Sequence, residues 1–215
     1  MKRYKNYIFD LDGTLLDTLD DLTASTNYAL HEFGMPVYSR DQIRMFVGNG
    51  VRKLIERAVP GGATNERFEE VLSVFQQHYL QHGMDHTVPY AGIVDLLTKL
   101  RAEGRRVAVV SNKFCAATKE LCDSFFGELV EVAIGENEAA GIKKKPSPDT
   151  VVEAMRQLGA TCDDTVYVGD SDVDIQTAKN SGIPCISVLW GFRDKDFLLV
   201  HGAETFVASP MDIIA

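Results

Sequence analysis

The residues best suited to chemistry stand together near the start of the chain, where Asp10, Asp12 and Thr14 surround Gly13. Two carboxylates only one residue apart repel each other, so they normally need a cation, a shared proton or open water nearby. The apolar residues 7–9 ahead of them are typical of a buried strand, which would deliver both carboxylates to its carboxyl end. We therefore expect this stretch to be the reactive centre and to bind a cation.

Strands alternating with helices are predicted along most of the chain. The predicted strands are residues 4–10, 106–110, 130–134, 165–168 and 185–189, with 206–208 as a further edge, and the predicted helices between them are 93–103, 116–126, 150–158 and 173–180. This alternation indicates an α/β fold with a doubly wound (Rossmann-like) parallel sheet. Ligands of such sheets bind beyond the carboxyl ends of the strands, where Asp10, Ser111 and Asp170 are expected.

A purely helical stretch interrupts the alternation. Apolar residues recur at helical spacing over residues 19–33, 39–46, 49–59 and 65–81, and no strand is predicted between Leu16 and Val88. We therefore predict an α/β catalytic core formed by residues 1–16 and 87–215, with a helical cap formed by residues 17–86. Hinges are expected near residues 16–18 and 83–89.

Composition and charge limit the possible partners. The 215 residues are 45% hydrophobic, which is enough for a real core, and the formal net charge of −9 with a pI of about 5.0 argues against nucleic acid or an anionic membrane as partner. The apolar stretch after the basic N-terminus is too short for a signal peptide or a membrane span, so we expect a cytoplasmic protein. The four cysteines form no CxxC pair and are expected to be reduced.

Four short motifs occur in an order that resembles the haloacid dehalogenase superfamily. They are DLDGT at residues 10–14, Ser111 at a strand end, Lys145 in KPSP, and Asp170 in GDSDVD. Each stands at a predicted strand end or loop, and together they span nearly the whole chain. The helical insertion directly after the first motif is similar to the cap of phosphoglycolate-phosphatase-like members, and GNGV at residues 48–51 resembles that subgroup.

The resemblance implies a phosphatase that forms an aspartyl-phosphate. Asp10 would attack phosphorus, and a carboxylate suits this role because it is already ionised at neutral pH. Asp12 would donate a proton to the leaving alcohol and later accept one from the hydrolytic water. Gly13 would let the chain turn so that both carboxylates face one substrate.

The same resemblance implies Mg²⁺ as cofactor. Its protein ligands would be Asp10, the backbone carbonyl of Asp12 and Asp170, because Mg²⁺ prefers oxygen ligands. Asp174 would orient a metal-bound water rather than contact the ion. The acidic residues at 170, 172 and 174 could also cap a helix, and that role is compatible with metal binding.

Two motifs would complete the phosphate site. Lys145 would offset the repulsion between an anionic nucleophile and an anionic phosphoryl group, and Ser111 with the backbone amide of Asn112 would bind phosphoryl oxygens. Taken alone, residues 143–145 are a solvated charge run and Ser111 is a small residue closing a strand. Both roles therefore depend on the complete set of motifs.

Substrate choice is assigned to the insertion, because a closing cap would expel water and contact the part of the substrate beyond the phosphate. Gly48 and Gly50 would let the backbone approach the ligand, and Arg52 or Lys53 could bind a carboxylate or simply be solvated helix charges. The leading substrate is a small phosphorylated metabolite, 2-phosphoglycolate. Inorganic pyrophosphate, a nucleoside monophosphate and a sugar phosphate, the last including a phosphomutase reaction, are the alternatives.

Two readings outside the phosphatases also follow from these motifs. A non-catalytic phosphate-binding regulatory module would carry the same sites, but every motif residue is intact, which favours an enzyme. A dehalogenase would not need the proton donor Asp12. The protein is expected to be a monomer or a homodimer.

One further pattern is set aside. His78, His82 and His86 have the spacing of a metal-binding helix face, but Gly83 is expected to end the helix before the last of them. A zinc site there is not predicted.

Overall fold

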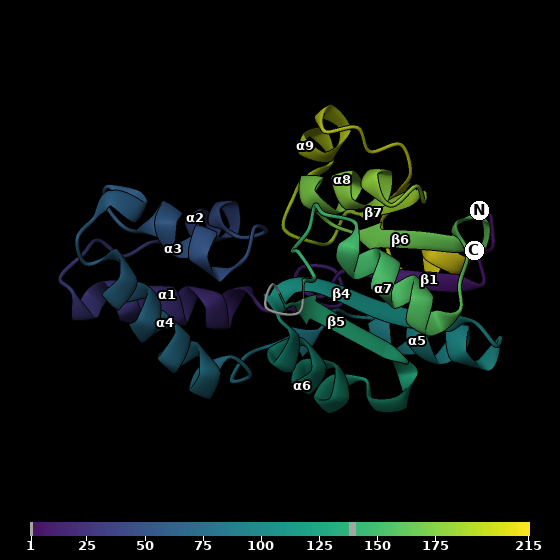
Figure 1. The fold of residues 1–215 in the computed structure, drawn as a ribbon, viewed down its shortest axis with the longest axis horizontal. Coiled ribbons are helices and arrows are strands. Elements are labelled where there is room, and N and C mark those ends of the chain that lie inside the picture. The colour runs from purple at the N-terminus through teal and green to yellow at the C-terminus, as the bar shows by residue number, and fades with distance from the viewer. Residues whose placement is uncertain (1, 138–140) are drawn as a thin grey trace. The chain divides into compact units, whose positions relative to one another are not determined.

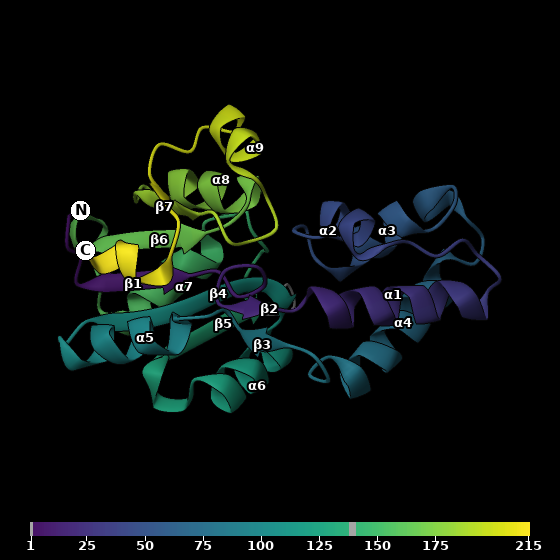
Figure 2. The same ribbon diagram turned by 180° about the vertical axis from the view of Figure 1, so that it is seen from behind.

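The computed structural model describes residues 2–137 and 141–215. The chain forms two compact units, Met1–Leu16 together with Pro89–Ala215, and Asp17–Val88. The first is an α/β unit and the second is built from helices, as Figures 1 and 2 show from opposite sides. Among the described residues, none of the helices combines the length and the apolar character that a membrane span requires.

In the described part of the α/β unit, six parallel strands form one sheet in the order β5-β4-β1-β6-β7-β8. Their bounds are β1 Asn6–Phe9, β4 Arg106–Phe114, β5 Val132–Glu136, β6 Thr165–Gly169, β7 Cys185–Val188 and β8 Phe206–Val207. Strand β1 is central, with Tyr7 opposite Val107 on one side and Val166 on the other. The predicted doubly wound parallel sheet is confirmed.

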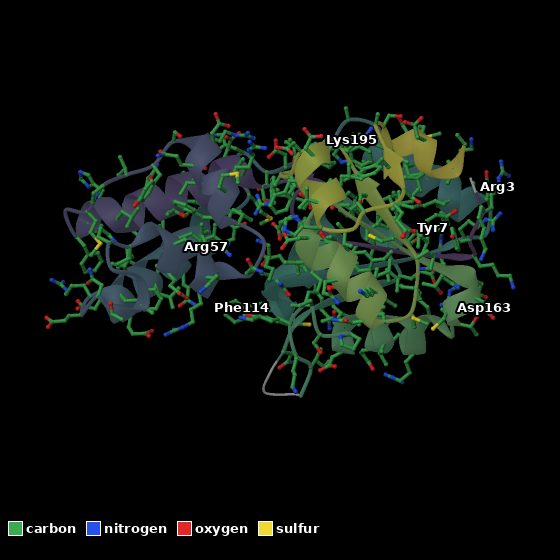
Figure 3. The ribbon with its side chains drawn as sticks, turned by 90° about the horizontal axis from the view of Figure 1, so that it is seen from above. Arg3, Tyr7, Arg57, Phe114, Asp163 and Lys195 are labelled. Carbon is green, nitrogen blue, oxygen red and sulfur yellow. The ribbon has the colours of Figure 1, made fainter. Side chains whose placement is uncertain are left out.

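Helices pack on both faces of this sheet, because successive side chains of a strand point to opposite faces. Tyr7 and Phe9 belong to a core cluster with side chains of α5 and α6, whereas Ile8 belongs to one with side chains of α7 and α8. Tyr7, which is labelled in Figure 3, is only 1% exposed. The helices of the unit are α5 Ile93–Ala102, α6 Cys115–Phe125, α7 Asp149–Leu158, α8 Asp172–Asn180 and α9 Lys195–Val200, with 3-10 helices at Gly127–Leu129, Cys162–Asp164 and Pro210–Ile214.

Strand β4 runs further than predicted. We expected it to end at Val110, but it continues through Ser111 to Phe114. Its regular pairing with β5 holds from Ala108 to Val110 and then shifts register before Phe114 meets Glu136. The polar residues after Val110 therefore form an irregular continuation of the strand, which apolar periodicity does not predict.

The helical unit contains α1 Leu19–Glu32, α2 Arg40–Phe46, α3 Val51–Ala58 and α4 Phe68–His82, with a 3-10 helix at Gly62–Thr64. Helix α2 begins with a capping box, in which Ser39 Oγ accepts a hydrogen bond from Gln42 N and Gln42 Oε1 accepts one from Ser39 N. The core of the unit includes Leu22, Ile43 and Phe75, which are fully or almost fully buried. At its two ends, β2 Leu16–Asp17 pairs with β3 Val88–Pro89. These two-residue strands are too short to produce the periodicity on which our strand predictions depend.

Asp21 joins the beginning of the helical unit to its end. Its carboxylate is 1% exposed and accepts hydrogen bonds from the backbone amides of His86 and Thr87 and from the Thr87 hydroxyl. Burial raises the pKa of this carboxyl, but the hydrogen bonds from Thr87 and His86 outweigh burial and hold the pKa below its ordinary value. Asp21 is therefore a buried charged group that stabilises the unit in its ionised form.

Candidate active site

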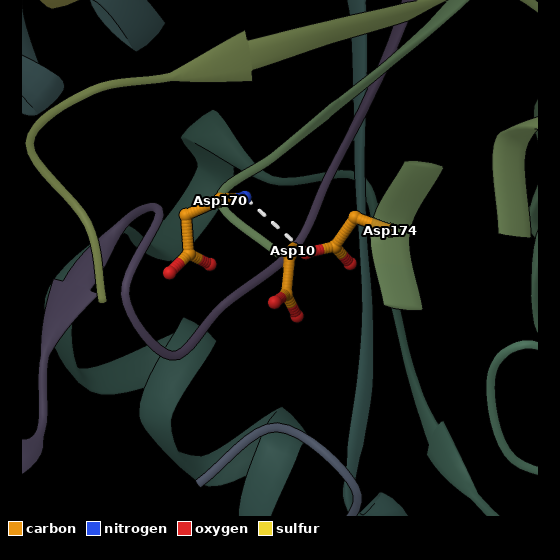
Figure 4. A group of neighbouring side chains, drawn as sticks. All are labelled: Asp10, Asp170 and Asp174. Carbon is orange, nitrogen blue, oxygen red and sulfur yellow. Dashed lines mark hydrogen bonds between the residues drawn. The ribbon is translucent and has the colours of Figure 1, made fainter. Parts of the chain in front are cut away.

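Three buried aspartates meet at the carboxyl end of the sheet. Asp10 follows β1, Asp170 follows β6, and Asp174 stands in the first turn of α8. One carboxylate oxygen from each lies within 4.8 Å of the others (Figure 4). The structure thus brings together the predicted residues of two motifs that are far apart in the sequence.

Asp174 is bonded to the protein through both of its oxygens. Oδ2 accepts hydrogen bonds from the backbone amides of Asp170 and Ser171 and from Ser171 Oγ, the first of which is the dashed line in Figure 4. Oδ1 accepts hydrogen bonds from Lys145 Nζ at 2.8 Å and from the Tyr167 hydroxyl at 3.0 Å. Asp174 therefore holds Asp170, Ser171 and Lys145 through hydrogen bonds, and its place behind the metal ligands stays a prediction.

Asp170 is held from the opposite side. Thr14 Oγ1 donates a hydrogen bond to Asp170 Oδ1 at 3.1 Å, and the Phe192 amide donates one to Oδ2 at 2.7 Å. Trp190 Nε1 donates to the carbonyl of Thr14 at 3.0 Å. Gly13 has φ +87°, and a Cβ there would lie 2.5 Å from Asp170 Oδ2, so glycine is required by both backbone and space. Our sequence reasoning missed Trp190 and Phe192, because a loop after a strand carries no periodic signal.

Lys145 lies between two of the aspartates. Its Nζ is 2.7 Å from Asp10 Oδ1 and 2.8 Å from Asp174 Oδ1, and it donates a hydrogen bond to the Tyr167 hydroxyl at 3.1 Å. Asn112 holds the main chain of this lysine from both directions, because its Oδ1 accepts from Lys145 N at 2.7 Å and its Nδ2 donates to Lys145 O at 3.1 Å. The side chain of Asn112 thus has a positioning role that we did not predict beside its expected backbone role.

Asp12 faces a second lysine. Ser111 Oγ donates a hydrogen bond to Asp12 Oδ2 at 3.3 Å, and Lys113 Nζ lies 3.3 Å from Asp12 Oδ1. The side chain of Lys113 is only 6% exposed. The structure therefore places Ser111 next to Asp12, beside a buried ammonium group that our sequence reasoning did not single out, and the predicted role of Ser111 at the phosphoryl group stays a prediction.

The electrostatics of the site favour a bound cation. Burial and the nearby charge of Asp174 raise the pKa of Asp10 well above its ordinary value, although Lys145 acts in the other direction. Burial and Asp174 likewise raise the pKa of Asp170 to about 7. Burial would lower the pKa of Lys145, but Asp10 and Asp174 outweigh it and raise this pKa. Three buried carboxylates around one ammonium group leave an excess of negative charge, and hard oxygen donors of this kind fit Mg²⁺.

The cap residues that we predicted for specificity lie in the helical unit. Gly48 and Gly50 have φ of 122° and 83°, and the Gly50 carbonyl accepts the hydrogen bond from Leu54 N that begins α3. Arg52 forms a two-fold ion pair with Glu69, and its guanidinium lies 4.9 Å from the centre of the Phe68 ring. The role of these residues in substrate binding stays a prediction.

The histidines of α4 and the segment after it have separate partners. His78 Nδ1 is 3.0 Å from Ser25 Oγ, and the next histidine, His82, pairs with Asp85 at 2.8 Å. His86 pairs with Asp21 at 2.9 Å. In the described part of the chain, the group of potential metal ligands is the one formed by the aspartates of the α/β unit.

The sequence also matches a known protein family. The sequence model of the haloacid dehalogenase-like hydrolases matches residues 7–188. The chain therefore belongs to the haloacid dehalogenase-like hydrolase family, as its motifs indicated.

Two relatives and one solved structure are similar to this chain over most of its length. The chain is 34% identical over 187 residues to the phosphoglycolate phosphatase of Aquifex aeolicus, covering 86% of this chain and 84% of that protein. It is 33% identical over 204 residues to the phosphoglycolate phosphatase of Colwellia psychrerythraea, covering 92% and 89%. The crystal structure of a candidate phosphoglycolate phosphatase from Lactobacillus delbrueckii subsp. bulgaricus is 38% identical, with a TM-score of 0.94 and coverage of 99% and 97%.

Proposed function

We propose that this enzyme, a phosphoric monoester hydrolase of the haloacid dehalogenase-like family, hydrolyses 2-phosphoglycolate through an aspartyl-phosphate with Mg²⁺ as cofactor. The observation that carries the proposal is the buried cluster in which Lys145 lies 2.7 Å from Asp10 while Asp170 and Asp174 complete an oxygen-rich group. The relatives named phosphoglycolate phosphatases support the choice of substrate.

In the first step, a carboxylate oxygen of Asp10 attacks phosphorus and the bond from phosphorus to the leaving oxygen breaks. Asp12 gives its proton to that oxygen, so that glycolate leaves as an alcohol. In the second step, water attacks the phosphorus of the aspartyl-phosphate, Asp12 accepts a proton from this water, and the Asp10 carboxylate is regenerated. Inorganic phosphate is the second product.

The other residues of the site make these steps possible. Lys145 offsets the repulsion between the Asp10 carboxylate and the anionic phosphoryl group, and Ser111 with the Asn112 amide binds phosphoryl oxygens. Mg²⁺, held by Asp10, the backbone carbonyl of Asp12 and Asp170, would supply positive charge to the same phosphoryl oxygens. Asp174 positions Asp170 and Lys145 through the hydrogen bonds described above.

The helical unit Asp17–Val88 is proposed as the cap domain. In this proposal it contacts the part of the substrate beyond the phosphate, with Gly48, Gly50 and Arg52 as the first candidates. The enzyme would act in the cytoplasm, as a monomer or a homodimer, on a small substrate without nucleic acid or membrane.

Phosphate release from a panel of substrates in the presence of Mg²⁺ tests the proposal. The panel contains 2-phosphoglycolate, pyrophosphate, a nucleoside monophosphate, a sugar phosphate and an aryl phosphate, ranked by kcat/KM. We expect 2-phosphoglycolate to rank first and Asp10→Asn to lower its turnover by at least about 10⁴-fold. A low rank would refute the substrate, and equal phosphate release by wild type and Asp10→Asn would refute the mechanism.

A further inference from the structure

Two buried lysines lie at different aspartates of the site. Lys145 lies on the side of the nucleophile, where its Nζ contacts Asp10 and Asp174. Lys113 lies on the side of the proposed proton donor, 3.3 Å from Asp12 Oδ1. The proposed function gives Lys145 a task at the phosphoryl group, but it gives none to Lys113.

A buried ammonium group is costly unless it serves an anion, because an ion loses several kcal/mol of hydration on burial. Lys113 stands in the irregular continuation of β4, and its amide donates a hydrogen bond to Ser111 Oγ at 3.1 Å. This bond and the Ser111–Asp12 contact fix the main chain of Lys113 beside the carboxylate of Asp12. The ammonium group is thus held at the place where the leaving group must be protonated.

The position of the leaving group follows from the role of Asp12. The oxygen that receives the proton must lie within hydrogen-bonding distance of the Asp12 carboxylate. In 2-phosphoglycolate this oxygen is bonded to a methylene carbon that carries the carboxylate, so the carboxylate must lie close to Asp12 as well. Asp12 is protonated when it acts as the acid, so the substrate carboxylate is the anion at this place, and a carboxylate removed from water needs a cation or hydrogen-bond donors beside it.

We infer that Lys113 binds the carboxylate of the leaving group and thereby selects phosphate esters of 2-hydroxy acids. The inference rests on the proposed function and deepens it, because it names the chemical group by which the substrate is recognised. Lys113 already pairs with Asp12, and its ammonium group carries three donors, so the substrate carboxylate would be a further anion at the same cation. In this arrangement a residue of the α/β unit, Lys113, binds the carboxylate of the leaving group.

Arg52 and Lys53 of the helical unit are the cations that the sequence suggested for this carboxylate, and Lys53 is 44% exposed and pairs with Glu56. The side chain of Arg52 is 56% exposed and its partner Glu69 is 69% exposed. A charge interaction at such an exposed place is weakened by water, whereas the same interaction at Lys113 takes place in a buried site of lower effective dielectric constant. Lys113 is therefore the cation that we assign to the substrate carboxylate.

Kinetics on two matched substrates test it. Ethyl phosphate has a methyl group where 2-phosphoglycolate has its carboxylate. We expect Lys113→Met to lower the ratio of kcat/KM for 2-phosphoglycolate to kcat/KM for ethyl phosphate by about 20-fold, because loss of the Lys113–Asp12 pair affects both substrates, whereas loss of a charge partner affects only the substrate that carries a carboxylate. Lys119→Met, the same substitution at an exposed lysine of α6, is expected to change neither value by more than about 2-fold.

A binding measurement keeps the test independent of turnover. The non-hydrolysable analogue 3-phosphonopropionate retains the carboxylate, and propylphosphonate lacks it. Wild type is expected to bind the first at least about 10-fold more tightly, Lys113→Arg to keep most of this preference, and Lys113→Gln to lose it. Circular dichroism melts show whether each variant is folded, and Lys113→Arg serves in place of an unfolded Lys113→Met.

The outcomes separate this inference from the proposed function. If wild type shows no preference for 2-phosphoglycolate over ethyl phosphate, the proposed substrate fails and this inference fails with it. If wild type shows the preference but Lys113→Met lowers kcat/KM equally for both substrates, or for neither, the proposed substrate stands and the inference is overturned. Equal losses would mean that Lys113 acts only on Asp12 or on the phosphoryl group.

Discussion

Charged groups are used differently in the two units of the molecule. In the α/β unit, Lys145 is 3% exposed and contacts two buried carboxylates. In the helical unit, Arg52 pairs with Glu69 and Arg67 with Glu70, and all four side chains are more than half exposed. Exposed pairs contribute about 0–1 kcal/mol to stability, whereas removal of one partner from a buried pair costs about 3–5 kcal/mol.

Single substitutions of charged residues should therefore have different effects on stability and activity in the two units. The α/β unit depends on a few charges that cannot be exchanged for others, because each is buried and bonded from more than one direction. The helical unit has surface pairs that are individually replaceable. Asp21 departs from this pattern, because it is a buried carboxylate in the helical unit. Substitutions at the buried charges should therefore have larger effects than substitutions at the exposed pairs.

Metal removal should expose the excess negative charge of the α/β unit. The raised pKa values of Asp10 and Asp170 mean that the folded, metal-free protein still binds protons that the unfolded chain has released above its carboxyl pKa of 3.8. The free energy of unfolding should therefore fall as the pH rises from 3.8 toward the raised values, about 7 for Asp170, by on the order of 4 kcal/mol for Asp170 alone.

Urea denaturation between pH 5 and pH 7.5, with a chelator or with excess Mg²⁺, measures this effect. Mg²⁺ is expected to remove most of the pH dependence, since it binds only the folded state. Asp170→Asn without metal should show a shallower slope than wild type. A metal-free protein whose stability is constant or rises over this range would contradict the prediction.

The buried carboxylate of the helical unit, Asp21, should be as sensitive to substitution as the buried groups of the α/β unit, but its pH dependence has the opposite sign. Asp21→Asn is expected to lower the free energy of unfolding by about 2–3 kcal/mol, because several hydrogen bonds to a buried charge are lost. Because its folded pKa lies below its unfolded value of 3.8, Asp21 contributes stability above pH 3.8 and loses it as the pH falls through the folded pKa. Chemical denaturation at pH 7 and at pH 3 measures both effects.

Asp20→Asn is the matched control for this prediction. Asp20 precedes Asp21 in α1, pairs with Arg40 and is 56% exposed, so the same substitution should cost less than about 1 kcal/mol. Similar losses for the two variants would remove the distinction between buried and exposed charges in this unit.

Loss of the Asn112 side chain should misplace Lys145 without removing its charge. Asn112→Ala removes the two hydrogen bonds to the Lys145 main chain, and we expect kcat to fall by about 10- to 100-fold with little change in KM. Asn180→Ala is the control, because it removes a hydrogen bond to the carbonyl of Pro146 at an exposed place. Steady-state kinetics that show equal effects for both variants would argue against a positioning role.

Among these substitutions, Arg52→Met is expected to change kcat/KM least. Its guanidinium already pairs with Glu69 and lies over Phe68, so Arg52→Met should lower kcat/KM for 2-phosphoglycolate by less than about 3-fold. Comparison with ethyl phosphate measures any carboxylate-specific loss. A large loss confined to 2-phosphoglycolate would move recognition of the carboxylate to the helical unit.

The sequence predicts the meeting of Asp10 and Asp170 for a physical reason, whereas Lys145 was predicted from the order of the motifs. Parallel strands end at one edge of the sheet, so Asp10 and Asp170 had to meet once their strands were recognised. The apolar runs of these strands are buried on both faces and are therefore easy to recognise. Their roles in catalysis remain proposals.

Other parts of the site depend on packing that no local pattern reports. Lys113 lies beyond the regular part of β4, and the Tyr167 hydroxyl reaches Lys145 from within an apolar strand. Trp190 and Phe192 act through a loop whose path depends on the close approach of Gly191 to Asp170. Such contacts join residues that are far apart in the sequence, so only the folded chain brings them together.

The central place of β1 has a consequence for synthesis of the protein. This strand is synthesised before both of its partners, and one of them, β6, begins only at Thr165. Until then β1 has an unpaired edge, and an apolar strand edge of this kind is a template for association with other chains. The strand that positions the proposed nucleophile Asp10 thus keeps one edge open to association until β6 is made.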